Sequence, residues 1–178
     1  MTKICLCAIF RNESKNVKRC LDAAKPVLDF ISICDTGSTD NTIELIEQWG
    51  REHGIPTKVH SEPFINFGHN RTRSFDLAVE SFPEADYVLL LDADLILQVG
   101  ADWQKSDLTK DAYLVRQVQP FIDYWNTRLV KANLPWKSVG VTHEYWECQL
   151  PHQQGKLTSL VIDCLLYTSD AADDTPCV

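Results

Sequence analysis

The sequence predicts a three-layer α/β fold in which helices cover both faces of a mostly parallel sheet. Three observations predict it. Strand-like runs alternate with helical periodicity through the first half of the chain. The run Tyr87–Leu91 is apolar at every position, as in a central strand buried on both faces. The acidic triplet Asp92-Ala93-Asp94 follows directly, at the edge where open α/β sheets bind ligands.

The strands and helices are expected in strict alternation up to the triplet. The first helix carries its apolar residues on one stripe, and Pro26 ends it because proline lacks a backbone N–H. In the second helix, Asn41 and Glu44 have capping-box spacing, and Gly54 follows as the C-cap. The expected strands are Ile4–Phe10, Phe30–Cys34, Thr57–His60 and Tyr87–Leu91, and the expected helices are Ser14–Ala24, Asn41–His53 and Arg71–Phe82.

The pattern changes after the triplet. The stretches Tyr113–Val118 and Ile122–Val130 predict an antiparallel pair with a turn near Gln119-Pro120. A chain of 178 residues suits one domain, and the sequence contains no recognisable linker or repeat. We therefore expect one domain over residues 1–162, with an antiparallel addition to its parallel sheet.

The last residues, 163–178, are expected to be foreign to the fold. The stretch Cys164–Asp173 reads in order as the translation of a transposase-type sequencing adapter, and Asp163 fits the preceding codon. The alternative is a genuine acidic tail of low complexity. In either case we expect no functional site here. The natural sequence is expected to stop near Ile162, so that its own C-terminal part is missing from this chain.

Composition excludes several classes of function. The formal net charge of -8 argues against a nucleic-acid partner. No stretch approaches the ~20 apolar residues of a membrane span, and the N-terminus has no signal-peptide pattern. The seven cysteines have no metal-type spacing, and Cys5, Cys7 and Cys34 are expected to be buried thiols. The chain is therefore expected in the cytoplasm, free or at the cytosolic membrane surface.

The triplet is the first candidate site. In extended backbone, Asp92 and Asp94 would point to the same side and could hold one hard divalent cation, and through it a diphosphate. The alternative is an acidic turn that ends a strand. Phe10-Arg11-Asn12-Glu13 stands where a dinucleotide-binding protein has a glycine-rich loop. Without that loop, phosphates need a metal and an arginine, which makes the aspartate pair more significant.

The end of the second expected strand is the next candidate. Helix capping explains Asp40 and Asn41, but it does not explain Asp35, which sits at the strand tip. A carboxylate there can accept a hydrogen bond from a base N–H or a ribose hydroxyl. The alternative role for Asp35 is simple turn chemistry.

Three motifs occur in order at three successive strand tips: Arg11-Asn12-Glu13, Asp35-Thr36-Gly37-Ser38-Thr39-Asp40 and Leu91-Asp92-Ala93-Asp94. Together they resemble a family 2 glycosyltransferase of the Rossmann-like GT-A fold, over roughly Met1 to Glu147. The resemblance implies a nucleotide-sugar donor, usually UDP-linked, and a divalent metal, Mn²⁺ or Mg²⁺. It also implies inverting transfer to a hydroxyl of a glycan, lipid or protein acceptor.

The resemblance also implies roles for single residues. Asp35 matches the base or ribose contact, and Glu13 matches an acidic residue near the nucleotide. Asp92 matches the ribose-side aspartate, which shares the metal with its main ligand, Asp94. Leu95 departs from the relatives, which often have an acidic residue there, so one charge is missing from the rim.

Two arginines are candidate phosphate contacts. The stretch Asn66–Arg71 is expected to precede the third helix, and Arg71 would contact the diphosphate or the helix end. A solvated arginine is the alternative. Arg128 is a weaker candidate for the same role.

The stretch Trp136–Glu144 resembles a His-Glu element found after the acidic triplet in many of these transferases. His143 would complete the metal shell as a neutral imidazole, and Glu144 would be the general base. Neighbours in a regular strand face opposite sides, so both can serve only if the backbone bends, which Gly140 permits. The alternative is a polar strand end.

Two rival functions remain open. A nucleotidyltransferase would use the same sheet and metal but release pyrophosphate. A truncated domain would bind nucleotide without turnover.

Overall fold

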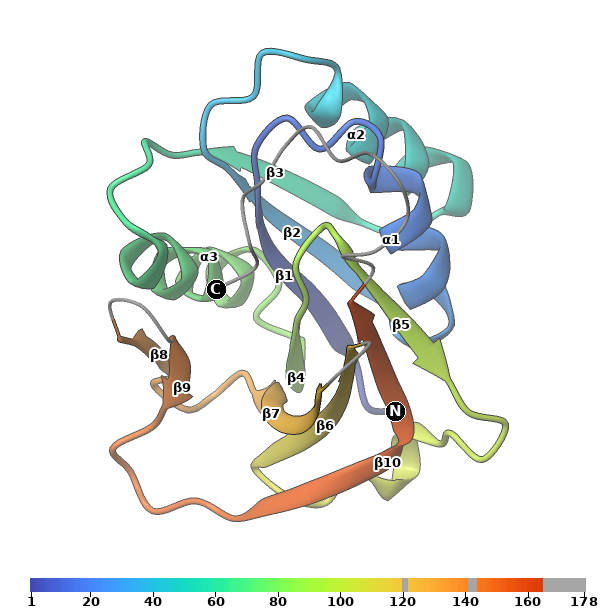
Figure 1. The fold of residues 1–178 in the computed structure, drawn as a ribbon, viewed down its shortest axis with the longest axis vertical. Coiled ribbons are helices and arrows are strands. Elements are labelled where there is room, and N and C mark those ends of the chain that lie inside the picture. Colours follow the sequence, from blue (N-terminus) through green and yellow to red (C-terminus); the bar gives the residue numbers. More distant parts are fainter. Residues whose placement is uncertain (120–121, 141–143, 165–178) are drawn as a thin grey trace.

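The computed structural model describes residues 1–119, 122–140 and 144–164. Strands and helices alternate in the first half, and strands dominate the second (Figure 1). The strands are β1 Ile4–Phe10, β2 Phe30–Asp35, β3 Thr57–Ser61, β4 Tyr87–Leu90, β5 Leu95–Val99, β6 Ala112–Gln119, β7 Ile122–Lys131, β8 Lys137–Val139, β9 Tyr145–Glu147 and β10 Gln154–Cys164; the helices are α1 Val17–Ala24, α2 Thr42–His53 and α3 Phe67–Ser81.

The main sheet has the strand order β3-β2-β1-β4-β7-β6-β10-β5. Strands β3, β2, β1 and β4 run parallel to one another, as predicted. Alternate residues of β1 face opposite layers: Leu6 packs in the cluster with α1 and α2, whereas Cys5 packs with α3. The expected three layers are therefore present, with α1 and α2 on one face and α3 on the other (Figure 1).

The second half of the sheet is mostly antiparallel. Strand β7 pairs antiparallel with both β4 and β6, which confirms the predicted pair after the triplet. The predicted turn at Pro120 lies outside the described residues. Strands β5, β8, β9 and β10 were not predicted; β10 runs parallel to β6 and antiparallel to β5. A separate hairpin, β8–β9, packs beside α3.

Strand β10 includes the first residues of the segment expected to be adapter-derived. Asp163 pairs with Ile96, and Cys164 pairs with Leu95 of β5. Residues 165–178 lie outside the described part of the chain. The adapter origin of residues 163–178 remains a prediction.

The starts of α1 and α3 differ from prediction because of local hydrogen bonds. Helix α1 begins at Val17 instead of Ser14, since the Glu13 carbonyl first accepts the Asn16 N–H (2.8 Å) in a turn. Helix α3 begins at Phe67, four residues before the predicted start. The side chain of Asn66 is its N-cap and accepts the backbone N–H of His69 at 2.8 Å.

Helix α2 also uses a different cap from the one predicted. Asn41 occupies the N-cap position but makes no side-chain capping bond within the described residues. Instead, Asp40 Oδ1 accepts the backbone N–H of Thr42 at 3.1 Å. At the other end, Gly54 is left-handed (φ 64°), as predicted for the C-cap.

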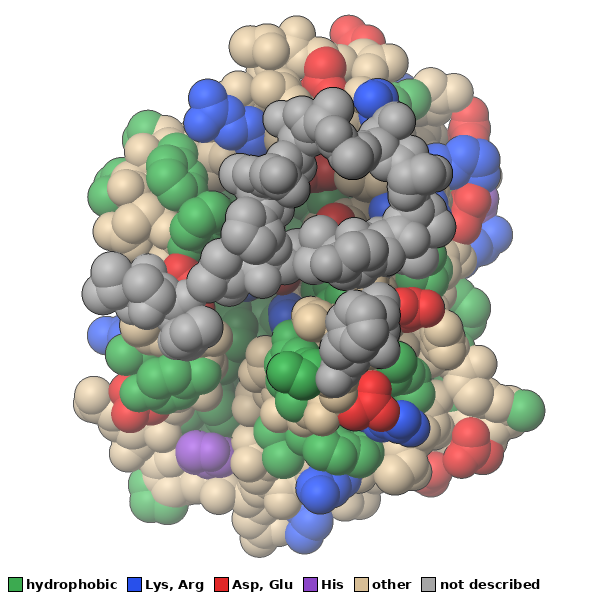
Figure 2. All heavy atoms as spheres, in the orientation of Figure 1, with side chains coloured by type: hydrophobic (Ala, Val, Ile, Leu, Met, Phe, Trp, Pro, Cys, Tyr) green, Lys and Arg blue, Asp and Glu red, His purple; other side chains and the backbone are tan. Residues whose placement is uncertain are grey.

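The cysteines of β1 and β2 are buried thiols, as predicted. Burial raises the pKa of Cys7 to about 12 and that of Cys34 to about 11. These thiols therefore act as small apolar side chains. Among the described residues, no helix is long and apolar enough to cross a membrane. On the face shown in Figure 2, acidic and basic side chains are intermixed.

Candidate functional site

The candidate site lies where β1, β2 and β4 end. Because these strands are parallel neighbours, their carboxyl ends meet at one edge of the sheet. Phe10, the last residue of β1, pairs with Asp35, the last residue of β2. The three motifs predicted to lie at strand tips are therefore adjacent in space.

The loops after β1 and β2 are hydrogen-bonded to each other. Asn12 adopts a left-handed conformation (φ 55°), and its Oδ1 accepts the backbone N–H of Thr39 at 2.7 Å. Its own N–H donates to Ser38 Oγ at 2.9 Å, and the N–H of Glu13 donates to Thr42 Oγ1 at 2.7 Å. Sequence reasoning treated Asn12 only as part of a motif and missed this clamp between the two loops.

Asp35 has one carboxylate oxygen that is hydrogen-bonded and one that is unpaired among the described residues. Its Oδ2 accepts the N–H groups of Gly37 (3.0 Å) and Ser38 (3.1 Å), and Gly37 has the positive φ of 103° that this turn requires. Its Oδ1 is buried and has no hydrogen-bond partner among the described residues. Buried polar atoms are nearly always paired, so this oxygen fits a ligand N–H or hydroxyl.

The acidic triplet forms a turn, which corrects the prediction of extended backbone at Asp92 and Asp94. The N–H of Leu95 donates to the Asp92 carbonyl at 3.2 Å, and β5 begins at once. The two carboxylates are therefore not placed on one side by the alternation of side chains along a strand. Both carboxylates still lie close enough to Glu13 to raise its pKa. Burial raises the pKa of Glu13, and repulsion from Asp94, Asp40 and Asp92 adds to that shift against a hydrogen bond from Asn16.

Arg71 joins the triplet to the His-Glu stretch. Its Nη1 lies 3.3 Å from Asp92 Oδ2, and its Nε lies 3.1 Å from Glu144 Oε2. The Nε contact is an ion pair without hydrogen-bond alignment. Only 22% of the Arg71 side chain is exposed, so the alternative of a solvated arginine is wrong.

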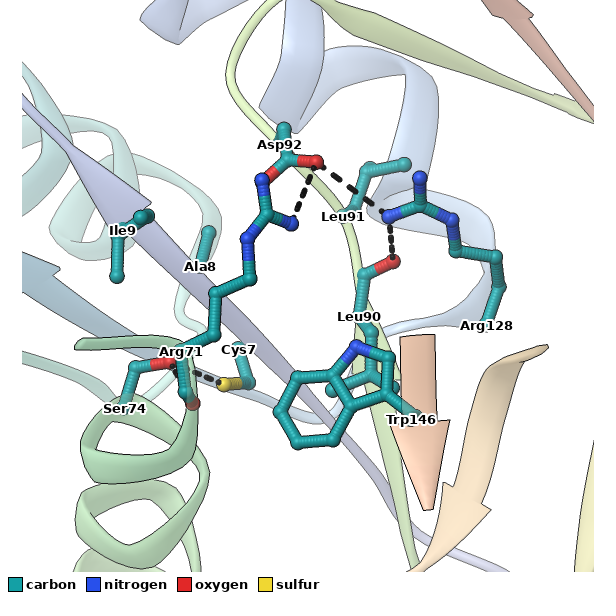
Figure 3. A pocket seen from close by; sticks show the side chains of 10 residues that line it. All are labelled: Cys7, Ala8, Ile9, Arg71, Ser74, Leu90, Leu91, Asp92, Arg128 and Trp146. Atoms are coloured by element: carbon teal, nitrogen blue, oxygen red, sulfur yellow. Dashed lines mark hydrogen bonds and ion pairs between the residues drawn. The ribbon is translucent and has the colours of Figure 1, made fainter. Parts of the chain in front are cut away.

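Arg128 reaches the same carboxylate from β7. Its Nη1 lies 3.4 Å from Asp92 Oδ2 and 3.3 Å from the Leu90 carbonyl, and its Nε donates to Gln117 Oε1 at 3.0 Å. Figure 3 shows Asp92 between the two guanidiniums, with Trp146 of β9 at the edge of the same pocket. Sequence reasoning ranked Arg128 below Arg71, because no local motif marks it.

These charges shift one another's protonation. Burial alone would raise the pKa of Asp92, but Arg71 and Arg128 outweigh it and hold the pKa below its ordinary value. Burial alone would lower the pKa of Arg71, but Asp92 and Glu144 outweigh it. For Glu144, burial raises the pKa, Arg71 opposes the shift and Asp92 adds to it. Glu144 is thus the carboxyl of this group that is easier to protonate.

The β8–β9 hairpin places Glu144 next to α3. The N–H of Ser138 donates to Thr72 Oγ1 at 3.0 Å. A Cβ on Gly68 would lie 3.4 Å from the Ser138 carbonyl oxygen, so helix and hairpin approach closely there. Gly140 has φ 120°, consistent with the predicted bend. His143 lies outside the described residues, and its predicted place in a metal shell stays a prediction.

The predicted metal ligands suit a hard cation in chemistry but are incomplete in number. Carboxylate oxygens, as in Asp92 and Asp94, are what Mg²⁺ and Mn²⁺ prefer. The described part of the chain contains no group of three or more His, Cys, Asp or Glu side chains placed to hold one ion. A cation at this turn would therefore need His143 or oxygens of a ligand to complete its shell.

Comparisons with known proteins agree with the motifs. The model of the family "Glycosyl transferase family 2" matches residues 5–105. An uncharacterized glycosyltransferase of Rickettsia felis is 29% identical over 130 residues, covering 71% of this chain and 42% of its own length. One from Rickettsia conorii is 30% identical over 128 residues, covering 70% and 42%. The chain thus spans less than half the length of these relatives.

Among solved structures, the chain resembles TarS of S. aureus, in a crystal structure of its residues 1–349 in complex with UDP. The TM-score is 0.51 at 19% identity, and the match covers 67% of this chain and 37% of that one. The likeness confirms the GT-A fold expected from the three motifs.

Proposed function

Because the chain belongs to glycosyltransferase family 2, we propose that it moves a sugar from a nucleotide-diphosphate sugar to an acceptor hydroxyl with inversion. One observation carries the proposal: a single guanidinium, that of Arg71, contacts Asp92 at the end of β4 and Glu144 beside β9. This contact brings the donor-side carboxylate and the candidate base to one point. A transferase needs both there, because the leaving group and the attacking hydroxyl meet at the same carbon.

The donor is proposed to be a UDP-sugar. The unpaired Oδ1 of Asp35 can accept the imino N–H of a uracil base or a ribose hydroxyl. The fold neighbour TarS was crystallised with UDP, which is in keeping with this choice. Asn12 and Gly37 shape the two loops around Asp35, so their role is to hold the acceptor oxygen in place.

A divalent cation, Mn²⁺ or Mg²⁺, is proposed to be held by Asp94 and Asp92 with His143. When bound, it supplies positive charge that stabilises the departing nucleoside diphosphate. Arg71 supplies a second positive charge on the same side, since a guanidinium pairs well with phosphate oxygens. Both features favour cleavage of the bond between sugar and diphosphate.

Glu144 is proposed to be the general base. Its carboxylate takes the proton of the acceptor hydroxyl, whose oxygen attacks the anomeric carbon from the face opposite the diphosphate. The raised pKa of Glu144 brings it closer to the working pH, which suits a base that must gain a proton. The acceptor itself, a glycan, lipid or protein, is set by residues that the site does not identify.

The test separates binding from turnover. Isothermal calorimetry with UDP and Mn²⁺ measures donor binding, and product analysis with a panel of UDP-sugars measures transfer or hydrolysis. Glu144→Gln should keep UDP binding and lose about 10²- to 10⁴-fold in turnover. Glu147→Gln, on an exposed position of the same hairpin, is the matched control and should behave as wild type.

The opposite results are informative. Unchanged turnover in Glu144→Gln would remove Glu144 from the mechanism. A wild-type chain that binds no UDP would overturn the proposal itself. Release of pyrophosphate from a nucleoside triphosphate would identify the rival nucleotidyltransferase.

A further inference from the structure

Two guanidiniums reach the same oxygen of Asp92, but the protein holds them differently. Arg128, from β7, has 9% of its side chain exposed, and Arg71, from α3, has 22% exposed. A buried charge is retained when several well-placed groups satisfy it. The remaining partners of each arginine therefore show which one is fixed.

Arg128 is held by uncharged acceptors as well as by Asp92. These are the side-chain oxygen of Gln117 (3.0 Å) and the carbonyl of Leu90 (3.3 Å), both in strands of the main sheet. Gln117 is itself buried, and its Nε2 lies 3.6 Å from Cys164 Sγ. These acceptors are fixed in neighbouring strands and hold the Arg128 guanidinium independently of Asp92, so Arg128 stays in place when a ligand arrives.

Arg71 is held mainly by other charges. Its ion-pair partners are Asp92 and Glu144, and the Glu144 contact lacks hydrogen-bond alignment. Its guanidinium also lies 6.0 Å from the ring centre of Phe67, an exposed side chain. A diphosphate offers the same guanidinium bidentate oxygens of higher charge, so it can replace these carboxylates.

We infer that Arg128 is a positioning residue, which keeps Asp92 oriented and compensated while Arg71 turns from Asp92 to the diphosphate of the donor. The inference rests on the proposed function, because it needs a diphosphate ligand. Without Arg128, Arg71 would be the only cationic side chain of the described residues that pairs with Asp92. The diphosphate of the donor would then compete with the part-buried Asp92 carboxylate for the Arg71 guanidinium, and the donor would bind less tightly.

The experiment is a double-mutant cycle on UDP binding. UDP is titrated calorimetrically, with Mn²⁺ present, into the full 178-residue chain and into Arg128→Met, Asp92→Asn and the double variant. We expect Arg128→Met to weaken UDP binding by about 10- to 100-fold, as for residues that orient a ligand-binding carboxylate. In the Asp92→Asn background, the same change should alter affinity by less than about twofold, because no carboxylate remains to be held.

Two further variants control for general damage. Arg128→Lys keeps the charge but cannot span Gln117 and Asp92 with one fork, so we expect partial rescue of UDP affinity. Arg116→Met removes an exposed arginine of β6 that pairs with Asp123, and should bind UDP as wild type does. If Arg128→Met alone does not fold, Arg128→Lys replaces it in the cycle, and its loss of UDP affinity should likewise disappear in the Asp92→Asn background.

The outcomes separate the two proposals. Equal loss from Arg128→Met in both backgrounds would mean that Arg128 does not act through Asp92, and the inference would fail while the function stands. Wild-type affinity in Arg128→Met would have the same consequence. A wild-type chain without UDP binding would overturn the proposed function, and this inference with it.

Discussion

The parallel and antiparallel halves of the main sheet contribute to the site in different ways. The parallel half, β3-β2-β1-β4, supplies loops whose side chains bond to nearby backbone, such as Asn12 to Thr39 and Asp35 to Gly37. The antiparallel half and the β8–β9 hairpin supply single charged side chains, Arg128 and Glu144, that act across long sequence distances. We propose that the parallel half binds the ligand and that Arg128 and Glu144 adjust the charge beside it.

This difference explains why the halves carry different sequence signals. A loop that folds on itself needs particular residue types at close spacing, and these appear as motifs. A charged side chain that reaches the site from a distant strand needs only the right sign and position, so no motif marks it in the sequence. The halves should therefore respond differently to substitution, and the following changes test that contrast.

The largest effect is expected from Asp94→Ala, in the turn at the end of the parallel half. If Asp94 is the main metal ligand, the metal-dependent part of UDP binding should fall by about 100-fold or more, since the loss of even an outer-shell partner costs about 10- to 100-fold. Calorimetry with and without Mn²⁺ measures it. Asp102→Ala, an exposed aspartate, is the control. Metal-dependent binding that survives in Asp94→Ala would rule out this ligand.

The next effect is expected from Asp35→Asn, which tests the proposed ligand-binding role of the parallel half. The new amide keeps one acceptor for the loop N–H groups of Gly37 and Ser38, but it turns a donor toward the ligand. A mismatched buried hydrogen bond costs about 1–3 kcal/mol, or about 5- to 150-fold in UDP affinity. The thermal stability should change little by comparison. Equal UDP binding by Asp35→Asn and wild type would argue that the unpaired Oδ1 faces no ligand.

The two arginines of α3 allow a matched comparison of stability. Arg71→Met leaves Asp92 and Glu144 without their shared cation, and we expect the free energy of unfolding to fall by about 1–3 kcal/mol, below the cost of a fully buried pair. Arg73→Met removes more exposed contacts with Glu62 and Glu80 and should cost about 0–1 kcal/mol. Urea unfolding measures both. Equal losses would mean that the ion pairs of Arg71 stabilise the fold no more than the exposed pairs of Arg73 do.

The smallest effect is expected from Asn66→Ala at the start of α3. Loss of the N-cap bond to His69 should lower the free energy of unfolding by about 1 kcal/mol. Because the cap fixes the first turn of the helix that carries Arg71, UDP affinity should also fall slightly. Thr72→Ser, which keeps the hydroxyl bonded to Ser138, is a control on the next turn. A stability loss near zero would show that this N-cap bond does not stabilise α3.

Sequence reasoning succeeded where the signal is local. The apolar run before Asp92 placed a central strand, and Gly54 marked the end of α2, because burial and a left-handed cap each restrict residue type. It was less accurate at Asn66, where a cap was read as part of a loop. It missed β5 and β10, which pair with each other across more than sixty residues of chain, as Val99 does with Leu160.

The sequence by itself determined the parallel sheet, its order of motifs and the carboxylates at its edge, since these follow from periodicity and turn chemistry. Only the tertiary structure decided that Asp92 lies between Arg71 and Arg128, and that Glu144 shares one of those cations. The physical reason is that ion pairing depends on distance in space. Sequence spacing predicts such distances within a helix, a strand or a tight turn, and not between a helix, a distant strand and a hairpin.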